Sequence, residues 1–164
     1  MTDSVAAVGR RTQEIWRELE RSVPDRDHAP SRYSAALLPF IDYVDRCSSP
    51  ADRLMVTGLY PEVYVIADRG FAGGQIAFLS GFYTDEAEQA RTIGRLKRQS
   101  VPFVLLIEDV RLAMPRLMAY VDTRYQPLAH VEVPGTPGVQ VLVERGRPHG
   151  GIDPSTGWPC FGER

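Results

Sequence analysis

The stretch from Asp52 to Gly74, DRLMVTGLYPEVYVIADRGFAGG, constrains the fold more than any other part of the chain. Its short apolar segment, Arg53 to Thr57, predicts a strand covered on both faces, and Gly58 then predicts a turn. A second turn is predicted at the glycine cluster Gly70 to Gly74. With a helix between the two turns, the stretch has the order strand, helix, strand.

The segment between these turns is predicted to be a helix that opens at Pro61 and Glu62. A proline at the first helical position loses no hydrogen bond, and a carboxylate is favoured at the positive end of the helix dipole. The β-branched residues that follow, Val63, Val65 and Ile66, would also suit a strand. We prefer the helix because the proline and the glutamate both favour it.

The rest of the chain repeats the alternation of strand and helix. The nearly all-apolar run Val101 to Ile107 is typical of a central parallel strand. In chain order, the other predicted elements are a helix with core-facing Ala35, Leu38, Ile41 and Val44, a strand Gln75 to Leu79, a helix capped by Thr84 with an apolar stripe of Ala87, Ala90, Ile93 and Leu96, a helix Pro115 to Tyr125, and a hairpin of Leu128 to Val133 and Val139 to Glu144.

Right-handed crossovers between such elements predict an α/β fold, a three-layer α/β/α sandwich around a Rossmann-like mixed sheet of about five strands. The parallel strands are expected in the order 2-1-3, and the sheet is expected to end in the antiparallel hairpin. We divide the chain into an N-terminal helix with a linker, residues 1–31, and a single α/β domain, residues 32–164.

Charge and hydropathy exclude some classes of partner. The net charge of −2 and the pI near 5.9 give no long-range attraction for nucleic acid. No run reaches the roughly 18–20 apolar residues of a membrane span, and Met1 to Arg21 lacks the apolar centre of a signal peptide. We therefore expect a soluble, unexported and thus cytoplasmic protein, unless the chain is a piece of a longer one.

Known catalytic and cofactor motifs do not fit this sequence. The turn Gly58-Leu-Tyr-Pro61 lacks the second and third glycines of the dinucleotide fingerprint, and the Gly70 to Gly74 cluster lacks the lysine of a phosphate loop. No serine stands in a GxSxG elbow. His28, His130 and His149 have no ligand-like spacing to acidic residues. We expect no catalytic residue, no metal and no cofactor.

The two cysteines, Cys47 and Cys160, are too far apart in sequence for a CxxC motif. They are either two unrelated buried thiols or a disulfide that pins the C-terminal tail to a helix in an oxidising compartment. The residues alone leave both alternatives open.

The rim beyond the carboxyl ends of the parallel strands is the expected place for any ligand site. Open α/β sheets bind ligands there, at the point where the strand order reverses. The residues expected at this edge are Tyr60, Glu62, Glu108 and Asp109, with Arg69 nearby. The alternative is a solvated rim whose carboxylates only cap helices.

A resemblance to a known family covers Tyr33 to Phe161. The residues that carry it are Pro50-Ala-Asp-Arg53, Leu54-Met-Val-Thr-Gly58, Tyr60-Pro-Glu-Val-Tyr64, Ala67-Asp-Arg69, Phe71-Ala-Gly-Gly74 and Gly157-Trp-Pro-Cys-Phe161. The sequence resembles the C-terminal region of multi-spanning glycosyltransferases that use polyprenyl-phosphate sugar donors, relatives of the protein O-mannosyltransferases. In that family the donor-binding membrane core and its acidic catalytic loop lie upstream, so no catalytic residue is carried over.

The resemblance implies a non-enzymatic domain on the extracytoplasmic face of the membrane, in which Cys47 and Cys160 form a disulfide. The implied partners are the membrane core of a parent protein and a glycan or lipid-linked sugar, and the implied role is help in recognising the acceptor. Two alternatives stay open. One is a small enzyme that binds a nucleotide sugar or phosphosugar at the strand-end rim; the other is a cytoplasmic interaction module that uses Ile15, Trp16 and Leu19.

Overall fold

The structure is a computed structural model that describes residues 32–133, 135 and 137–162. The N-terminal helix and linker expected at residues 1–31 lie outside these described residues. Among the described helices, none combines the length and the apolar character that crossing a bilayer requires.

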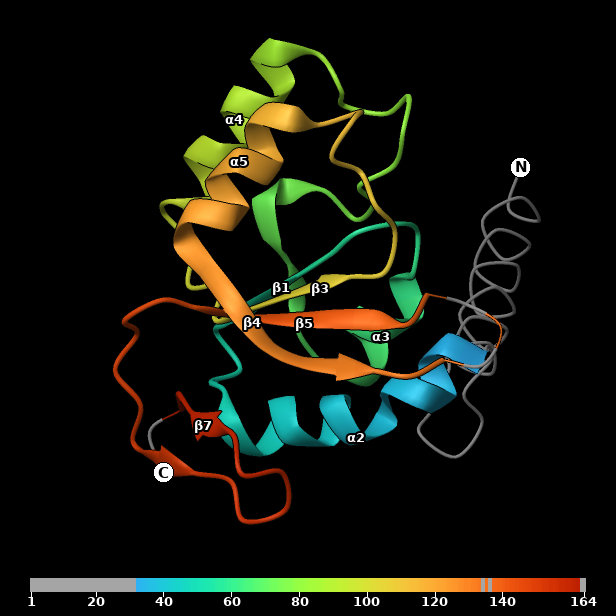
Figure 1. Cartoon of the computed structure of the whole chain (residues 1–164). Helices are drawn as coiled ribbons and strands as arrows, with labels where there is room; N and C mark the ends of the chain where they lie inside the picture. The colour runs from blue at the N-terminus through green and yellow to red at the C-terminus, as the bar shows by residue number, and fades with distance from the viewer. Residues whose placement is uncertain (1–31, 134, 136, 163–164) are drawn as a thin grey trace, which may run out of the picture.

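A five-stranded mixed sheet forms the centre of the fold (Figure 1), with the strand order β2-β1-β3-β5-β4. The parallel strands are β1 (Arg53–Val56), β2 (Gly70–Phe71) and β3 (Phe103–Leu106), and the antiparallel strands are β4 (Tyr125–Val131) and β5 (Val139–Glu144). The expected 2-1-3 order and the antiparallel hairpin at one edge are confirmed. The hairpin joins the sheet through β5, so β4 is the outermost strand.

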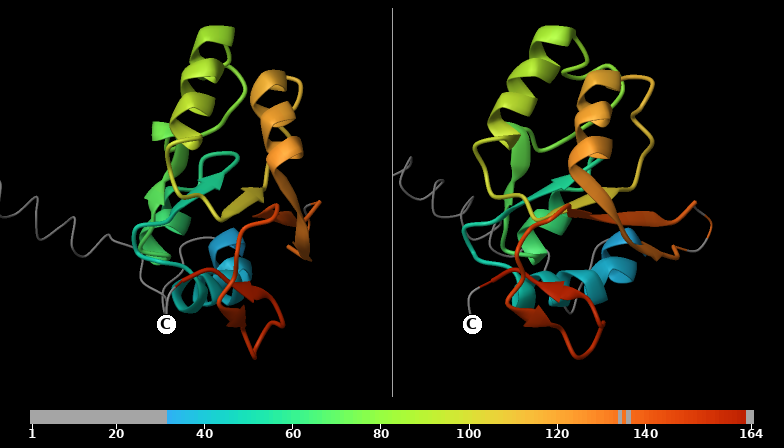
Figure 2. Two further views of the ribbon diagram at one scale, coloured as in Figure 1. Left: turned by 90° about the vertical axis from the view of Figure 1, so that its left-hand side faces the viewer. Right: turned by 60° about the vertical axis from the view of Figure 1, so that its left-hand side comes forward.

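Helices cover both faces of this sheet, which confirms the predicted three-layer α/β/α fold (Figures 1 and 2). One face carries α2 (Arg32–Cys47) and α3 (Pro61–Ile66), and the other carries α4 (Glu86–Leu96) and α5 (Pro115–Arg124). Helix α3 begins at the proline that predicted it and has Glu62 in its first turn.

The core has two halves because successive residues of a strand point to opposite faces of the sheet. In β1, Leu54 and Val56 pack in a cluster with α2 and α3, whereas Met55 packs with α4 and α5. In β3, Phe103 belongs to the first cluster and Val104 to the second. Both faces are therefore buried, which explains why these strands are continuous apolar runs rather than alternating ones.

The predicted strand Gln75 to Leu79 is wrong. The second parallel strand is Gly70–Phe71, inside the segment predicted to be a turn, and the short 3-10 helix η1 (Ala72–Gly74) follows it. Phe78 makes an isolated antiparallel bridge with Gly58 instead of joining the parallel sheet. A strand of two residues has no apolar periodicity, so the local pattern carries no signal for it.

The predicted core faces of two helices also need correction. In the part of α2 whose side chains are described, Leu37, Phe40, Ile41, Tyr43, Val44 and Cys47 are buried, while Ala35 is exposed. The buried residues of α4 are Gln89, Thr92 and Leu96. Ala87, from the predicted stripe, is exposed. Thr92 is tolerated inside because its hydroxyl accepts a hydrogen bond of 2.7 Å from the Gln75 side chain, a contact that hydropathy does not reveal.

Candidate functional site

The carboxyl ends of β1 and β3 lie side by side where the strand order reverses, and the Thr57 side chain joins them. Its hydroxyl donates to the Glu108 carbonyl (2.8 Å) and accepts from the backbone N–H groups of Ile107 (3.0 Å) and Glu108 (3.1 Å). Thr57 is fully buried. These three hydrogen bonds hold the ends of β1 and β3 together at the point where open α/β sheets bind a ligand.

Tyr60 covers the turn that follows β1. Gly58 has φ +97°, and a Cβ atom placed on it would lie 2.4 Å from the Tyr60 ring and 2.9 Å from a Glu108 carboxylate oxygen. The Tyr60 hydroxyl is 3.5 Å from the same carboxylate. The structure thus brings Tyr60 and Glu108 together at the rim, as the sequence predicts, in a packed arrangement above Gly58.

We expect Gly58→Ala to lower the free energy of unfolding by about 2–3 kcal/mol, because alanine is strained at positive φ and its methyl group would displace the Tyr60 ring. Gly81→Ala is the matched control, since Gly81 has φ +88° but no heavy atom within 4 Å of the added Cβ. Urea unfolding of both variants measures the difference. Equal losses in the two variants would mean that the contact with Tyr60 contributes nothing.

A cavity of about 380 Å³ opens beside Glu108, between the end of β3, helix α5 and the β4–β5 hairpin. Its polar lining consists of Glu108, Asp109, Arg111, His130 and Gln140, and its apolar lining includes Leu106 and Met118. This volume is within the range of small-ligand sites. The cavity contains two of the residues predicted for the rim, and it adds His130 and Gln140.

Carboxylate groups dominate the charge of this cavity. The Arg111 guanidinium, its cationic group, donates to Asp122 at 2.5 Å and lies 4.0 Å from Asp109. His130 faces Glu132, with 3.6 Å between the imidazole and the carboxylate. The carboxylates of Glu108, Asp109 and Asp122 outnumber the Arg111 guanidinium, so the net charge at the mouth is negative.

Arg69 lies away from the rim, so the expectation that it is near the other candidate residues is wrong. It immediately precedes β2 and therefore stands at the amino end of the parallel strands. Its guanidinium, which is buried, donates to the side chain and carbonyl of Ser48 and to the carbonyl of Val44. Arg69 thus provides hydrogen-bond donors for carbonyl groups at the C-terminal end of α2. Glu62 stays in the first turn of α3.

The helix N-termini at the rim are already occupied. The Gln89 side-chain oxygen accepts from the backbone N–H groups of Arg116 and Leu117, each at 3.1 Å, in the first turn of α5. The Asp85 carboxylate accepts from Glu88 N–H (2.8 Å) at the start of α4, and α3 begins with a proline. A phosphate group would need such N–H donors, and these are bonded within the protein.

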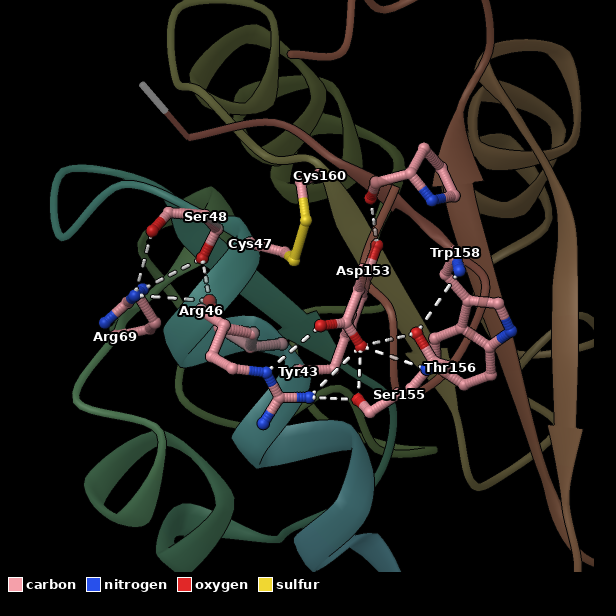
Figure 3. The surroundings of a disulfide bond; sticks show 12 residues. Tyr43, Arg46, Cys47, Ser48, Arg69, Asp153, Ser155, Thr156, Trp158 and Cys160 are labelled. Carbon is pink, nitrogen blue, oxygen red and sulfur yellow. Dashed lines mark hydrogen bonds and ion pairs between the residues drawn. A yellow bond between two sulfur atoms is a disulfide. The ribbon is translucent and has the colours of Figure 1, made fainter. Parts of the chain in front are cut away.

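A second cluster fastens the C-terminal segment onto α2, on the opposite side of the molecule from α4 and α5 (Figures 1 and 3). Cys47 and Cys160 form a disulfide, which decides between the two alternatives left by the sequence. The backbone N–H of Phe161 donates to the Cys47 carbonyl at 2.7 Å. This segment contains the short pair β6 (Gly151–Ile152) and β7 (Pro159–Cys160).

Asp153 organises the turn between β6 and β7. Two nitrogens of the Arg46 guanidinium donate to its carboxylate, each at 3.1 Å, and the Thr156 hydroxyl donates at 2.8 Å (Figure 3). The hydrogen bonds from Arg46 and then Ser155 hold the pKa of Asp153 well below its usual range. Asp153 was not among the residues predicted from the sequence, although the run Asp153-Pro-Ser-Thr156 consists of residues that favour turns.

The lowered pKa of Asp153 predicts a loss of stability in acid. A carboxyl whose pKa falls on folding stabilises the folded state above its unfolded value, near pH 4, and this contribution disappears as the pH decreases further. We expect the thermal midpoint of the wild type to fall more steeply between about pH 4 and pH 2 than that of Asp153→Asn. Arg46→Met, which removes the leading cause, should reduce the slope as well. Identical slopes in all three proteins would contradict this assignment.

Comparison of the chain with protein-family models, with curated proteins and with solved structures finds no match. Within the described residues, no group of three or more His, Cys, Asp and Glu side chains is placed to hold a metal ion.

Proposed function

We propose that the chain is a non-catalytic extracytoplasmic domain of a multi-spanning glycosyltransferase-like protein, where it packs on the membrane core and helps to recognise the acceptor. The observation that carries the proposal is the disulfide between Cys47 and Cys160. Disulfides of this structural kind persist in oxidising compartments and are rare in the cytosol. The bridge thus supports the location that the sequence resemblance implies.

The packed rim supports a role without catalysis. Thr57 ties the ends of β1 and β3 together, and Tyr60 lies over the turn after β1. The hydroxyl that this position could present to a substrate is here bonded to the backbone of Ile107 and Glu108. At this rim the acidic cavity beside Glu108 is open, and such a cavity suits binding.

An enzyme that uses a nucleotide sugar or phosphosugar is the second candidate, and its ligand chemistry fits this rim poorly. Phosphate groups favour cationic side chains and free helix N-termini. Here the cavity carries Glu108 and Asp109, and the first N–H groups of α5 are bonded to Gln89. The interaction module based on Ile15, Trp16 and Leu19 lies outside the described residues.

The test is the mass of the protein after thiol alkylation in denaturant, with and without prior reduction, for material made in an oxidising compartment. We expect Cys47 and Cys160 to gain label only after reduction, because they are bridged. The matched control is the same chain made in a reducing cytosol and alkylated at lysis, in which both thiols should label. Full labelling of unreduced protein from the oxidising compartment would overturn the proposal.

A further inference from the structure

Large apolar side chains are exposed on the loops that lie beyond the carboxyl ends of β1 and β3. They are Leu59 (54% exposed), Phe82 (60%), Tyr83 (49%) and Leu112 (101%). Single exposed apolar residues are common, but a group of them on neighbouring loops is typical of an interaction surface. We call these four residues, together with the cavity beside Glu108, the loop-end surface.

Contacts between the loops place the parts of this surface next to one another. Gly58 exchanges backbone hydrogen bonds with Phe78, which joins the loop after β1 to the loop before α4. Glu86 at the start of α4 forms an ion pair of 2.7 Å with Arg116 at the start of α5. In Figure 1 the loops after β1, η1 and β3 accordingly lie on the same side of the molecule.

The charge around these apolar residues decides what kind of partner fits. Four carboxylates accompany them, from Asp85, Glu86, Glu108 and Asp109. Two guanidinium groups lie among them, Arg111, which pairs with Asp122 and lies 4.0 Å from Asp109, and Arg116, which pairs with Glu86. The carboxylates are therefore in excess. The carboxylates of Glu86 (84% exposed) and Asp109 (78%) face solvent. A surface of this kind repels anionic lipid headgroups and nucleic acid and attracts cations.

We propose that the loop-end surface binds a basic, amphipathic polypeptide segment of a partner protein. A lysine or arginine of the segment enters the cavity, with its methylene groups against Leu106 and Met118 and its charge near Glu108 and Asp109. Apolar residues of the same segment cover Leu112 and the neighbouring exposed side chains. This goes beyond the proposed function, because the binding belongs to the domain alone and does not depend on its compartment.

The probe is a fluorescein-labelled 12-residue peptide of alternating lysine and leucine, titrated with the full chain and followed by fluorescence anisotropy. We expect saturable binding that weakens at least tenfold between about 50 and 300 mM salt, because the attraction is partly electrostatic. A glutamate–leucine peptide should not bind, and a lysine–serine peptide should bind at least tenfold more weakly. No binding of the lysine–leucine peptide at millimolar protein would overturn the proposal.

Variants with matched controls locate the binding. Glu108→Gln with Asp109→Asn, and separately Leu112→Ser, should each weaken binding at least fivefold. Asp68→Asn removes an exposed charge, and Val65→Ser removes a 48% exposed apolar side chain, at a groove away from the cavity; both should bind as the wild type does. Equal weakening by the control variants would overturn the assignment, as would stronger Leu112-dependent binding to phosphatidylcholine vesicles than to the peptide.

Discussion

Replacing both cysteines by serine, Cys47→Ser with Cys160→Ser, is expected to lower the free energy of unfolding by about 3–5 kcal/mol. The bridge joins residues 113 positions apart, so it removes many conformations from the unfolded chain. It also fixes the C-terminal segment, where the Trp158 ring packs edge-on against Tyr43 with 5.0 Å between the centroids. Urea unfolding of the oxidised wild type and the variant measures the loss.

Two comparisons separate the bridge from the side chains that form it. The reduced wild type should unfold at the same urea concentration as the double variant, and each single serine variant should match it. A double variant within about 1 kcal/mol of the oxidised wild type would show that the hydrogen bonds around Asp153 and Cys47 hold the segment by themselves.

The parts of the fold that the sequence predicts are those with strong local signals. The proline and the glutamate at the start of α3 identify this segment as a helix. The apolar run around Val104 identifies a central strand, because both faces of such a strand are buried. The two residues of β2 carry no such signal. The buried face of α4 also cannot be recognised from the sequence, because Gln89 and Thr92 are polar. Their burial depends on hydrogen bonds with residues outside α4.

Part of the candidate site could be predicted from the sequence, because the geometry of a parallel sheet places it. Parallel strands end at one edge, so Tyr60 after β1 and Glu108 after β3 had to meet there. His130 and Gln140 come from antiparallel strands, in which the end of β4 and the beginning of β5 reach the same edge. The pairing of Cys47 with Cys160 needed distances in space, which spacing in the sequence does not give.

Arg69→Ala is expected to lower the free energy of unfolding by about 3 kcal/mol, because the substitution empties a buried site and removes the guanidinium donors of the Ser48 carbonyl and hydroxyl and one of the donors of the Val44 carbonyl. The Arg69 side chain is only 4% exposed and bonds the Val44 and Ser48 carbonyls at the end of α2, 3.7 Å from the Asp45 carboxylate. Arg69→Lys keeps the charge but loses the planar fork, so it should recover only part of the loss.

Arg91→Ala is the matched control for Arg69→Ala, since the Arg91 side chain is 65% exposed and its ion pair with the neighbouring Glu88 spans 3.8 Å. It should change the free energy of unfolding by less than about 0.5 kcal/mol. Urea unfolding of the three variants decides the role of Arg69. If Arg69→Ala were as stable as Arg91→Ala, the bonds to α2 would contribute little, and Arg69 would again be a candidate for ligand binding. A loss confined to Arg69→Ala and partly restored by lysine assigns it to holding α2 on the sheet.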